Sequence, residues 1–182
     1  MQVISSFKKS NTTRIETLSG GQIHNDPVAE GYLSLGGFKS SYLIPNAKIG
    51  GLFEEVTVED SVNGRMDVKC IFLKNESGGS VSNLSLVIAG NKSFEKFYVG
   101  LSIPTSKING SVQRLQTTQE EPYGVDFELL SVNPLIFDGI TLENGEMIAL
   151  WIKRIILSKS ELGVEDITLK QQSSVDFVLS YT

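Results

Sequence analysis

Alternation of apolar and polar residues recurs along most of this chain after about residue 52. A period of two residues places apolar side chains on one face of an extended strand and polar side chains on the other. The alternation runs through residues 66–72, 84–88, 97–103, 125–129 and 175–181. No segment keeps a convincing 3.6-residue period over three turns. The pattern predicts an all-β fold with roughly seven or eight strands between residue 54 and residue 182.

Residues 147–157 break this rule, because they are apolar at successive positions and are interrupted only by Lys153 and Arg154. Such a run is typical of a central strand that is covered on both faces. We expect the two basic residues to form a solvated patch that protects the strand from aggregation. Asn-Gly and Asp-Gly pairs, which suit tight turns between antiparallel strands, separate several of the predicted strands. Together these signals predict an antiparallel β-sandwich, either immunoglobulin-like or jelly-roll.

The first part of the chain has a different texture. Residues 1–51 contain three Gly-Gly pairs and many Ser and Asn residues, without a sustained period of either kind. We therefore divide the chain into an extended N-terminal arm, residues 1–51, and a β-sandwich domain, residues 52–182. Short apolar clusters suggest that the arm packs on its own domain or on a neighbouring subunit, and the sequence leaves both open. The candidate interface residues are Tyr32, Leu35, Phe38, Tyr42 and Ile44. Aromatic and large apolar residues dominate interface energies.

Composition excludes several classes of chemistry. The 16 basic and 21 acidic residues leave a net charge of −5, which argues against a nucleic-acid partner. One His and one Cys cannot make a zinc site of the usual kind. Cys70 is expected to be a small buried residue, and residues 60–64 a solvated hairpin, since they lack the spacing of a calcium loop. A triad around His24 and Asp26 lacks the Gly-x-Ser-x-Gly elbow. We expect no catalytic residue, no metal, no cofactor and no enzymatic activity.

Targeting signals are also lacking. The first residues do not contain the apolar segment of a signal peptide. The longest apolar run, residues 147–152, is far shorter than the roughly 20 residues that span a bilayer. We expect a chain that is made in a reducing cytoplasm and has no membrane partner.

A series of short motifs resembles a known group of proteins. A Gly-Gly stretch at residues 35–41 leads to Leu-Phe and Val within residues 51–56. The strand-like sequences CIFLKN (residues 70–75) and ALWIKR (residues 149–154) follow. This series is similar to tailed-bacteriophage virion proteins of unassigned role, with Leu73 and Lys153 as mild departures. The resemblance covers roughly residues 35–157, and its motifs are structural.

The resemblance implies a non-enzymatic virion protein, made in the host cytoplasm. An auxiliary or decoration protein of the capsid, docking through the arm and the sandwich surface, is the first choice. A neck or tail component is the alternative. Its partners would be other virion proteins, such as major capsid, portal, neck or tail subunits, in a homo-oligomer or lattice. A carbohydrate- or receptor-binding module is a further alternative and would need exposed aromatic side chains. A β-sandwich hydrolase would lack a nucleophile–base pair.

Overall fold

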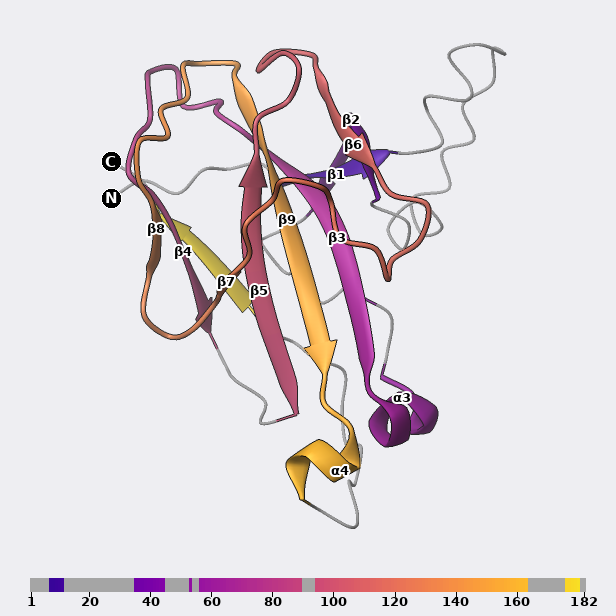
Figure 1. Ribbon diagram of the computed structural model, residues 1–182. Coiled ribbons are helices and arrows are strands. Elements are labelled where there is room, and N and C mark those ends of the chain that lie inside the picture. The colour runs from indigo at the N-terminus through magenta and orange to yellow at the C-terminus, as the bar shows by residue number, and fades with distance from the viewer. Residues whose placement is uncertain are drawn as a thin grey trace.

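Two antiparallel sheets and two short helices make up the computed structural model (Figure 1). The structure describes residues 7–11, 35–44, 53, 56–89, 94–163 and 176–180. Within these residues it contains ten strands, all paired antiparallel. The prediction of an all-β, antiparallel fold is confirmed.

The larger sheet has seven strands in the order β6-β2-β1-β3-β9-β5-β7. Their bounds are β1 Phe7–Asn11, β2 Gly36–Ile44, β3 Arg65–Lys74, β5 Glu95–Ser102, β6 Ser111–Arg114, β7 Glu128–Leu129 and β9 Met147–Ile156. The smaller sheet has the order β10-β4-β8, with β4 Leu84–Ala89, β8 Leu135–Phe137 and β10 Asp176–Ser180. The helices are α3 Val58–Asn63 and α4 Lys159–Leu162.

The long pair β3–β9 lies at the centre of the larger sheet. Ten Cα pairs join the two strands, from Arg65 opposite Ile156 to Lys74 opposite Met147. Every residue of β9 from Met147 to Ile152 is buried, so both faces of this strand are covered. The prediction of a central strand from its apolar residues at successive positions is therefore confirmed.

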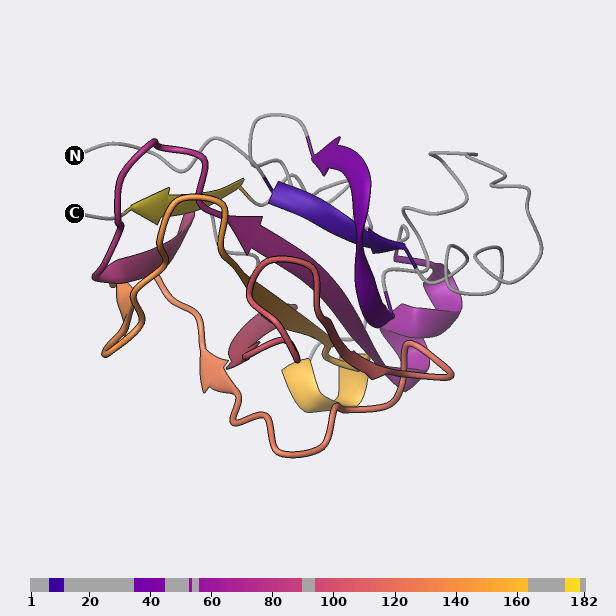
Figure 2. The same cartoon turned by 90° about the horizontal axis from the view of Figure 1, so that it is seen from above.

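A separate apolar core covers each face of this pair. The first contains residues of both sheets: Phe53, Ile71, Leu73, Val81, Leu84, Leu86, Ile88, Phe97, Val99, Leu130, Leu142, Ile148, Leu150 and Ile152. The second, on the opposite face of β3 and β9, consists of Leu35, Val68, Cys70, Phe72, Leu115, Met147, Ala149 and Trp151. Figure 2 shows the larger sheet and the strands beside it from above. Cys70 is fully buried, as predicted.

The basic pair of β9 is not a solvated patch, which corrects the sequence interpretation. Arg154 has no exposed surface, and its Nη2 lies 2.6 Å from Oδ2 of Asp67, its cross-strand neighbour. Nη1 of Arg154 lies 3.5 Å from Oε1 of the buried Glu95. The guanidinium group also lies over the ring of Phe53, 4.7 Å from its centroid. A charge can be buried in this way only when opposite charges and hydrogen bonds compensate for lost hydration.

Lys153 points to the other face and is held by aromatic rings. Its Nζ lies 4.5 Å from the ring centroid of Phe127 and 5.0 Å from that of Tyr98. A carboxylate oxygen of Glu121 lies 3.0 Å from the same nitrogen. The ammonium group is thus held by cation–π contacts and an ion pair, and its apolar stem covers part of the sheet.

Two capping boxes explain the helices that the period of the sequence did not predict. At α3, the Thr57 hydroxyl accepts from the Asp60 N–H at 3.1 Å, and the Asp60 carboxylate accepts from the Thr57 N–H at 2.7 Å. Ser158 and Glu161 form the same reciprocal pair at α4. Residues 60–64, expected to be a solvated hairpin, therefore belong mainly to a helix. The signal was Thr-x-x-Asp, which resembles the known Ser/Thr-x-x-Glu box.

Two stretches of the predicted arm are strands that pair with their own chain. β1 lies between β2 and β3, and β2 also pairs with β6. The backbone of residues 7–11 and 36–44 is therefore part of the larger sheet. The rest of residues 1–51, apart from Leu35, lies outside the described residues.

The alternation at residues 125–129 was also misleading. Only Glu128 and Leu129 form a strand, β7, whereas Val125 and Phe127 pack against the second core from outside any strand. Alternation reports which side chains are buried. It does not establish that the backbone pairs with a neighbour.

Removing the Asp67 carboxylate should destabilise the fold strongly. In Asp67→Ala, Arg154 loses the acceptor 2.6 Å away, and Arg65 loses one at 2.9 Å. We expect a loss of about 3 kcal/mol in the free energy of unfolding, measured by urea denaturation. The exposed Asp138→Ala is the control and should change stability by less than about 0.5 kcal/mol. Equal effects in the two variants would contradict the role of the buried pair.

The cap of α3 should make stability depend on acid pH. Burial raises the pKa of Asp60, but hydrogen bonds from Thr57 and the charge of Arg65 outweigh it, so the net pKa is lowered. A lowered folded-state pKa gives stability that is complete above the unfolded pKa of about 3.9 and is lost as pH falls through the folded value. Asp60→Asn should therefore be less stable than the parent at pH 7. The difference should shrink below about pH 4; a difference that stays constant down to pH 2 would contradict this account.

Candidate functional site

Four of the five candidate interface residues lie in β2 or directly before it. Leu35 is 6% exposed and belongs to the second core, so it covers its own chain. Phe38, Tyr42 and Ile44 lie in β2, whose backbone pairs with β1. Tyr32 lies outside the described residues. The structure thus brings four of the five onto one segment and assigns Leu35 to the core. For the others, contact with a partner stays a prediction.

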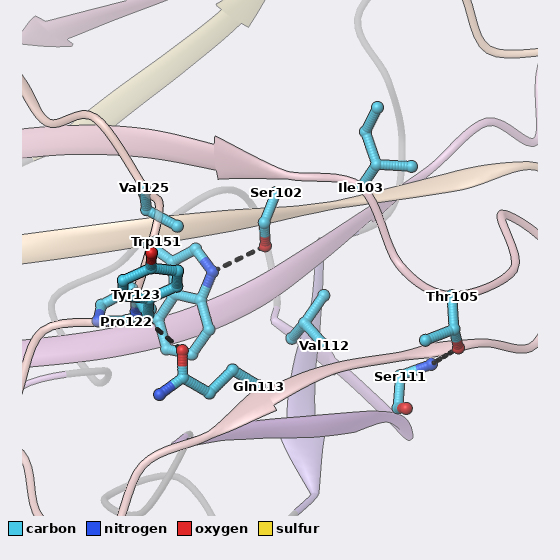
Figure 3. Close-up of a pocket in the computed structure, with 10 residues that line it drawn as sticks. All are labelled: Ser102, Ile103, Thr105, Ser111, Val112, Gln113, Pro122, Tyr123, Val125 and Trp151. Atoms are coloured by element: carbon cyan, nitrogen blue, oxygen red, sulfur yellow. Dashed lines mark hydrogen bonds between the residues drawn. The ribbon is translucent and has the colours of Figure 1, made fainter.

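A surface cavity of about 340 Å³ lies on the second-core face of the sheet. Its lining comes from the end of β5, from β6, from the turn at residues 122–125 and from β9 (Figure 3). The residues are Ser102, Ile103, Thr105, Ser111, Val112, Gln113, Pro122, Tyr123, Val125 and Trp151. β6 forms one edge of the larger sheet, and β5 lies near the opposite edge. Because the cavity is lined from both of these strands, we call it the seam cavity.

Hydrogen bonds join the two sides of the seam. The Thr105 N–H donates to the main-chain oxygen of Ser111 at 2.9 Å, and the Ser111 N–H donates to Oγ1 of Thr105 at 3.0 Å. The segment after β5 is thereby tied to the first residue of β6. This tie holds the polar residues of both segments around one opening.

The indole of Trp151 forms the floor of the cavity. Its Nε1–H donates to Oγ of Ser102 at 2.8 Å, which satisfies the polar atom of an otherwise buried side chain. Trp151 as a whole residue has no exposed surface. Core packing was the sequence expectation for this residue, and it is confirmed. Its place beneath a cavity was not predicted.

Tyr123 supplies an exposed ring at the rim. It lies in the turn Pro122-Tyr123-Gly124, where Pro122 is buried and Gly124 has a φ of +70°. The Tyr123 N–H donates to Oε1 of Gln113 at 2.7 Å, which fixes the turn against β6. With 93% of its surface exposed, the side chain of Tyr123 is presented to solvent.

Two glycines allow the close approaches that shape the cavity. A Cβ at Gly36 would meet the main-chain oxygen of Gln113 and lie 2.7 Å from Cη2 of Trp151. A Cβ at Gly100 would meet Cγ1 of Val125 and lie 2.6 Å from the main-chain oxygen of Asp126. Any larger residue would push β6 or the 122–126 segment away from the floor.

The lining of the cavity is uncharged. Its lining contains hydroxyl, carboxamide, aromatic and aliphatic groups, and none of the ten residues is an Asp, Glu, Lys, Arg, His or Cys. No imidazole, carboxylate or thiol from the lining is therefore at hand to act as base or nucleophile. Among the described residues, no group of three or more His, Cys, Asp or Glu side chains could hold a metal ion. His24 and Asp26 lie outside these residues.

Three exposed apolar side chains lie in or between the edge strands β7 and β8. Leu129 is 55% exposed, Val132 67% and Ile136 57%. β7 ends the larger sheet, and β8 ends the smaller one. Exposed apolar residues beside sheet edges favour contacts with other chains.

Comparisons with known proteins found no relative of this chain. No protein-family model matches the sequence, and neither the curated proteins nor the solved structures that were compared gave a match. In the part of the chain that the structure describes, no helix has the length and apolar character needed to cross a membrane.

Adding one methyl group at Gly100 should disturb the cavity. The new Cβ of Gly100→Ala would overlap the Val125 side chain and the main-chain oxygen of Asp126, so the overlying segment must shift. We expect a loss of about 1–3 kcal/mol in unfolding free energy and a change in the emission wavelength of Trp151. Gly79→Ala is the control, because no atom lies within 4 Å of its added Cβ. A stable Gly100→Ala protein with unchanged emission would contradict this packing.

Proposed function

We propose that this chain is a non-enzymatic structural protein of a bacteriophage virion, first of all an auxiliary or decoration protein of the capsid. One observation carries the proposal. The motifs that resemble phage virion proteins at residues 70–75 and 149–154 fall largely on β3 and β9, the buried centre of the larger sheet. The resemblance therefore concerns the residues that specify the core.

The finer architecture belongs to the same proposal. The first core contains side chains from both sheets, which supports a β-sandwich. Leu129, Val132 and Ile136 give this domain an apolar surface that suits docking on neighbouring subunits. Major capsid, portal, neck or tail subunits are the expected partners, and the virion is the expected location. A neck or tail component remains the alternative.

We propose that the binding part of the arm is the connection between β1 and β2. β1 and β2 pair with Asn11 opposite Phe38, so the chain leaves and re-enters the sheet at nearby points. Residues 12–34, which contain the predicted anchor Tyr32, can therefore reach a neighbour while both strands stay in place. A segment that orders on a partner gains contact area there.

A carbohydrate- or receptor-binding module is the second candidate function. It required an exposed aromatic side chain, and Tyr123 at the rim of the seam cavity is one. This observation favours a ligand site and leaves the structural role intact, because a particle protein can also bind a ligand.

Shortening the β1–β2 connection should separate folding from assembly. We expect a chain in which a short Gly/Ser linker replaces residues 12–34 to fold with the parent's circular dichroism and urea midpoint. It should no longer enter particles produced by the phage that encodes it, as measured by mass spectrometry of purified virions. The control replaces the exposed turn residue Asp138 with Ser and should still be incorporated.

Three outcomes would count against this account. Absence of the parent chain from purified virions would remove the virion role. Normal incorporation of the shortened chain would exclude a role of residues 12–34 in binding to the particle. Unfolding of the shortened chain would place residues 12–34 in the core of the domain.

A further inference from the structure

We propose that the seam cavity binds the ring of a neutral sugar, as part of a free saccharide or a glycan. The proposal rests on the lining of the cavity and not on the virion role, so either can fail without the other. With about 340 Å³, the cavity lies near the lower end of the roughly 300–1,000 Å³ found for small-molecule sites. A single ring with its substituents is the appropriate scale of ligand.

The lining selects a neutral ligand. None of its ten residues carries a charge at neutral pH. A carboxylate, phosphate or ammonium group entering the cavity would lose hydration without meeting an opposite charge. The nearest basic residue of β9, Lys153, already pairs with Glu121 and lies over two aromatic rings. Anionic sugars and phosphorylated compounds are therefore disfavoured.

Polar groups around the opening suit a ligand with several hydroxyls. Ser102, Thr105 and Ser111 present hydroxyl groups, and Gln113 presents a carboxamide. The Ser102 oxygen accepts from Trp151, so its own O–H proton is not used in that bond. Gln113 accepts from the Tyr123 N–H through Oε1, which orients the amide group beside the opening. Hydroxyls that both donate and accept can meet such a mixed set.

Apolar surface in the same cavity suits the carbon face of a sugar ring. Tyr123 exposes its ring at the rim, Ile103 is 66% exposed, and Val112 and Val125 complete the wall. A purely apolar guest, such as a partner's aliphatic side chain, would cover the hydroxyl groups without hydrogen-bonding to them. Such unpaired polar groups cost affinity. A pyranose ring, with hydroxyls at its edge and C–H groups on its faces, satisfies both parts.

The chain carries its own probe for this test. Trp151 is the one tryptophan of the sequence, and it forms the cavity floor. A ligand that contacts Ser102, the hydrogen-bond partner of the indole, or that shifts Tyr123 should change the fluorescence of Trp151. We expect saturable changes with at least one neutral sugar in a panel of glucose, galactose, mannose, rhamnose, N-acetylglucosamine and N-acetylgalactosamine. Glucuronate, sialic acid and glucose 6-phosphate should give no saturable change.

Variants at the rim make the assignment specific. Tyr123→Ala and Gln113→Ala should each weaken the best sugar at least tenfold in isothermal titration calorimetry, while the urea midpoint stays near that of the parent. Val58→Ser is the control, because Val58 is an exposed apolar residue of α3, outside the lining. It should bind as the parent does. Tyr123→Phe, which keeps the ring, should retain most of the affinity.

Defined results would overturn the proposal. The first is a panel, extended to a glycan array, in which no neutral sugar binds. The second is sugar binding that Tyr123→Ala leaves unchanged. The third is stronger binding of p-cresol or of the anionic sugars than of every neutral sugar, since the cavity would then accept an apolar side chain or an anion. A positive array with a negative monosaccharide panel would support the glycan as the source of the ring.

Discussion

Burial of the β3–β9 pair on both faces is the constraint on which the rest of the structure depends. Two ten-residue strands in continuous register present apolar side chains to two separate cores. Strands of this kind cannot remain in water on either side, so other segments must cover both faces. The smaller sheet covers one face through β4. The segments around β6 and residues 122–127 cover the other, and the seam cavity lies between these covers.

At one end of the same pair the apolar core gives way to buried charge. Asp67 lies directly opposite Arg154 in the register, and Arg65 adds a second cation to the same carboxylate oxygen. A buried pair of this kind contributes little net stability, because lost hydration offsets the attraction. Its directional bonds nevertheless fix which residues face each other. A one-residue slip of β3 against β9 would separate Asp67 from Arg154 and turn each side chain to the wrong core.

Much of this centre could be predicted from sequence, because local pattern and burial agree there. The apolar run of β9 predicted a strand that is covered on both faces. The alternation of apolar and polar residues in β3 predicted a second strand, which pairs with β9. The same logic failed at Val125 and Phe127, whose side chains are partly buried although their backbone crosses β5 at Gly100. It also missed β1 and β2. Glycine and serine residues interrupt the alternation of apolar and polar side chains there, and the strands that pair with them lie far along the chain. The cavity depends on residues from four separate segments, so no local signal could reveal it.

β2 connects the two functional proposals physically. On one side it pairs with β1, where the connection proposed to bind a neighbouring subunit begins and ends. On the other side it pairs with β6, and Gly36 at its start lies against Trp151 beneath the cavity. A partner that pulls on residues 12–34 would exert a force on β2. The hydrogen bonds of β2 to β1 and β6 oppose a shift of the strand. If both proposals hold, β2 would separate the contact with a neighbouring subunit from the ligand site, because its two neighbours in the sheet, β1 and β6, belong to different sites.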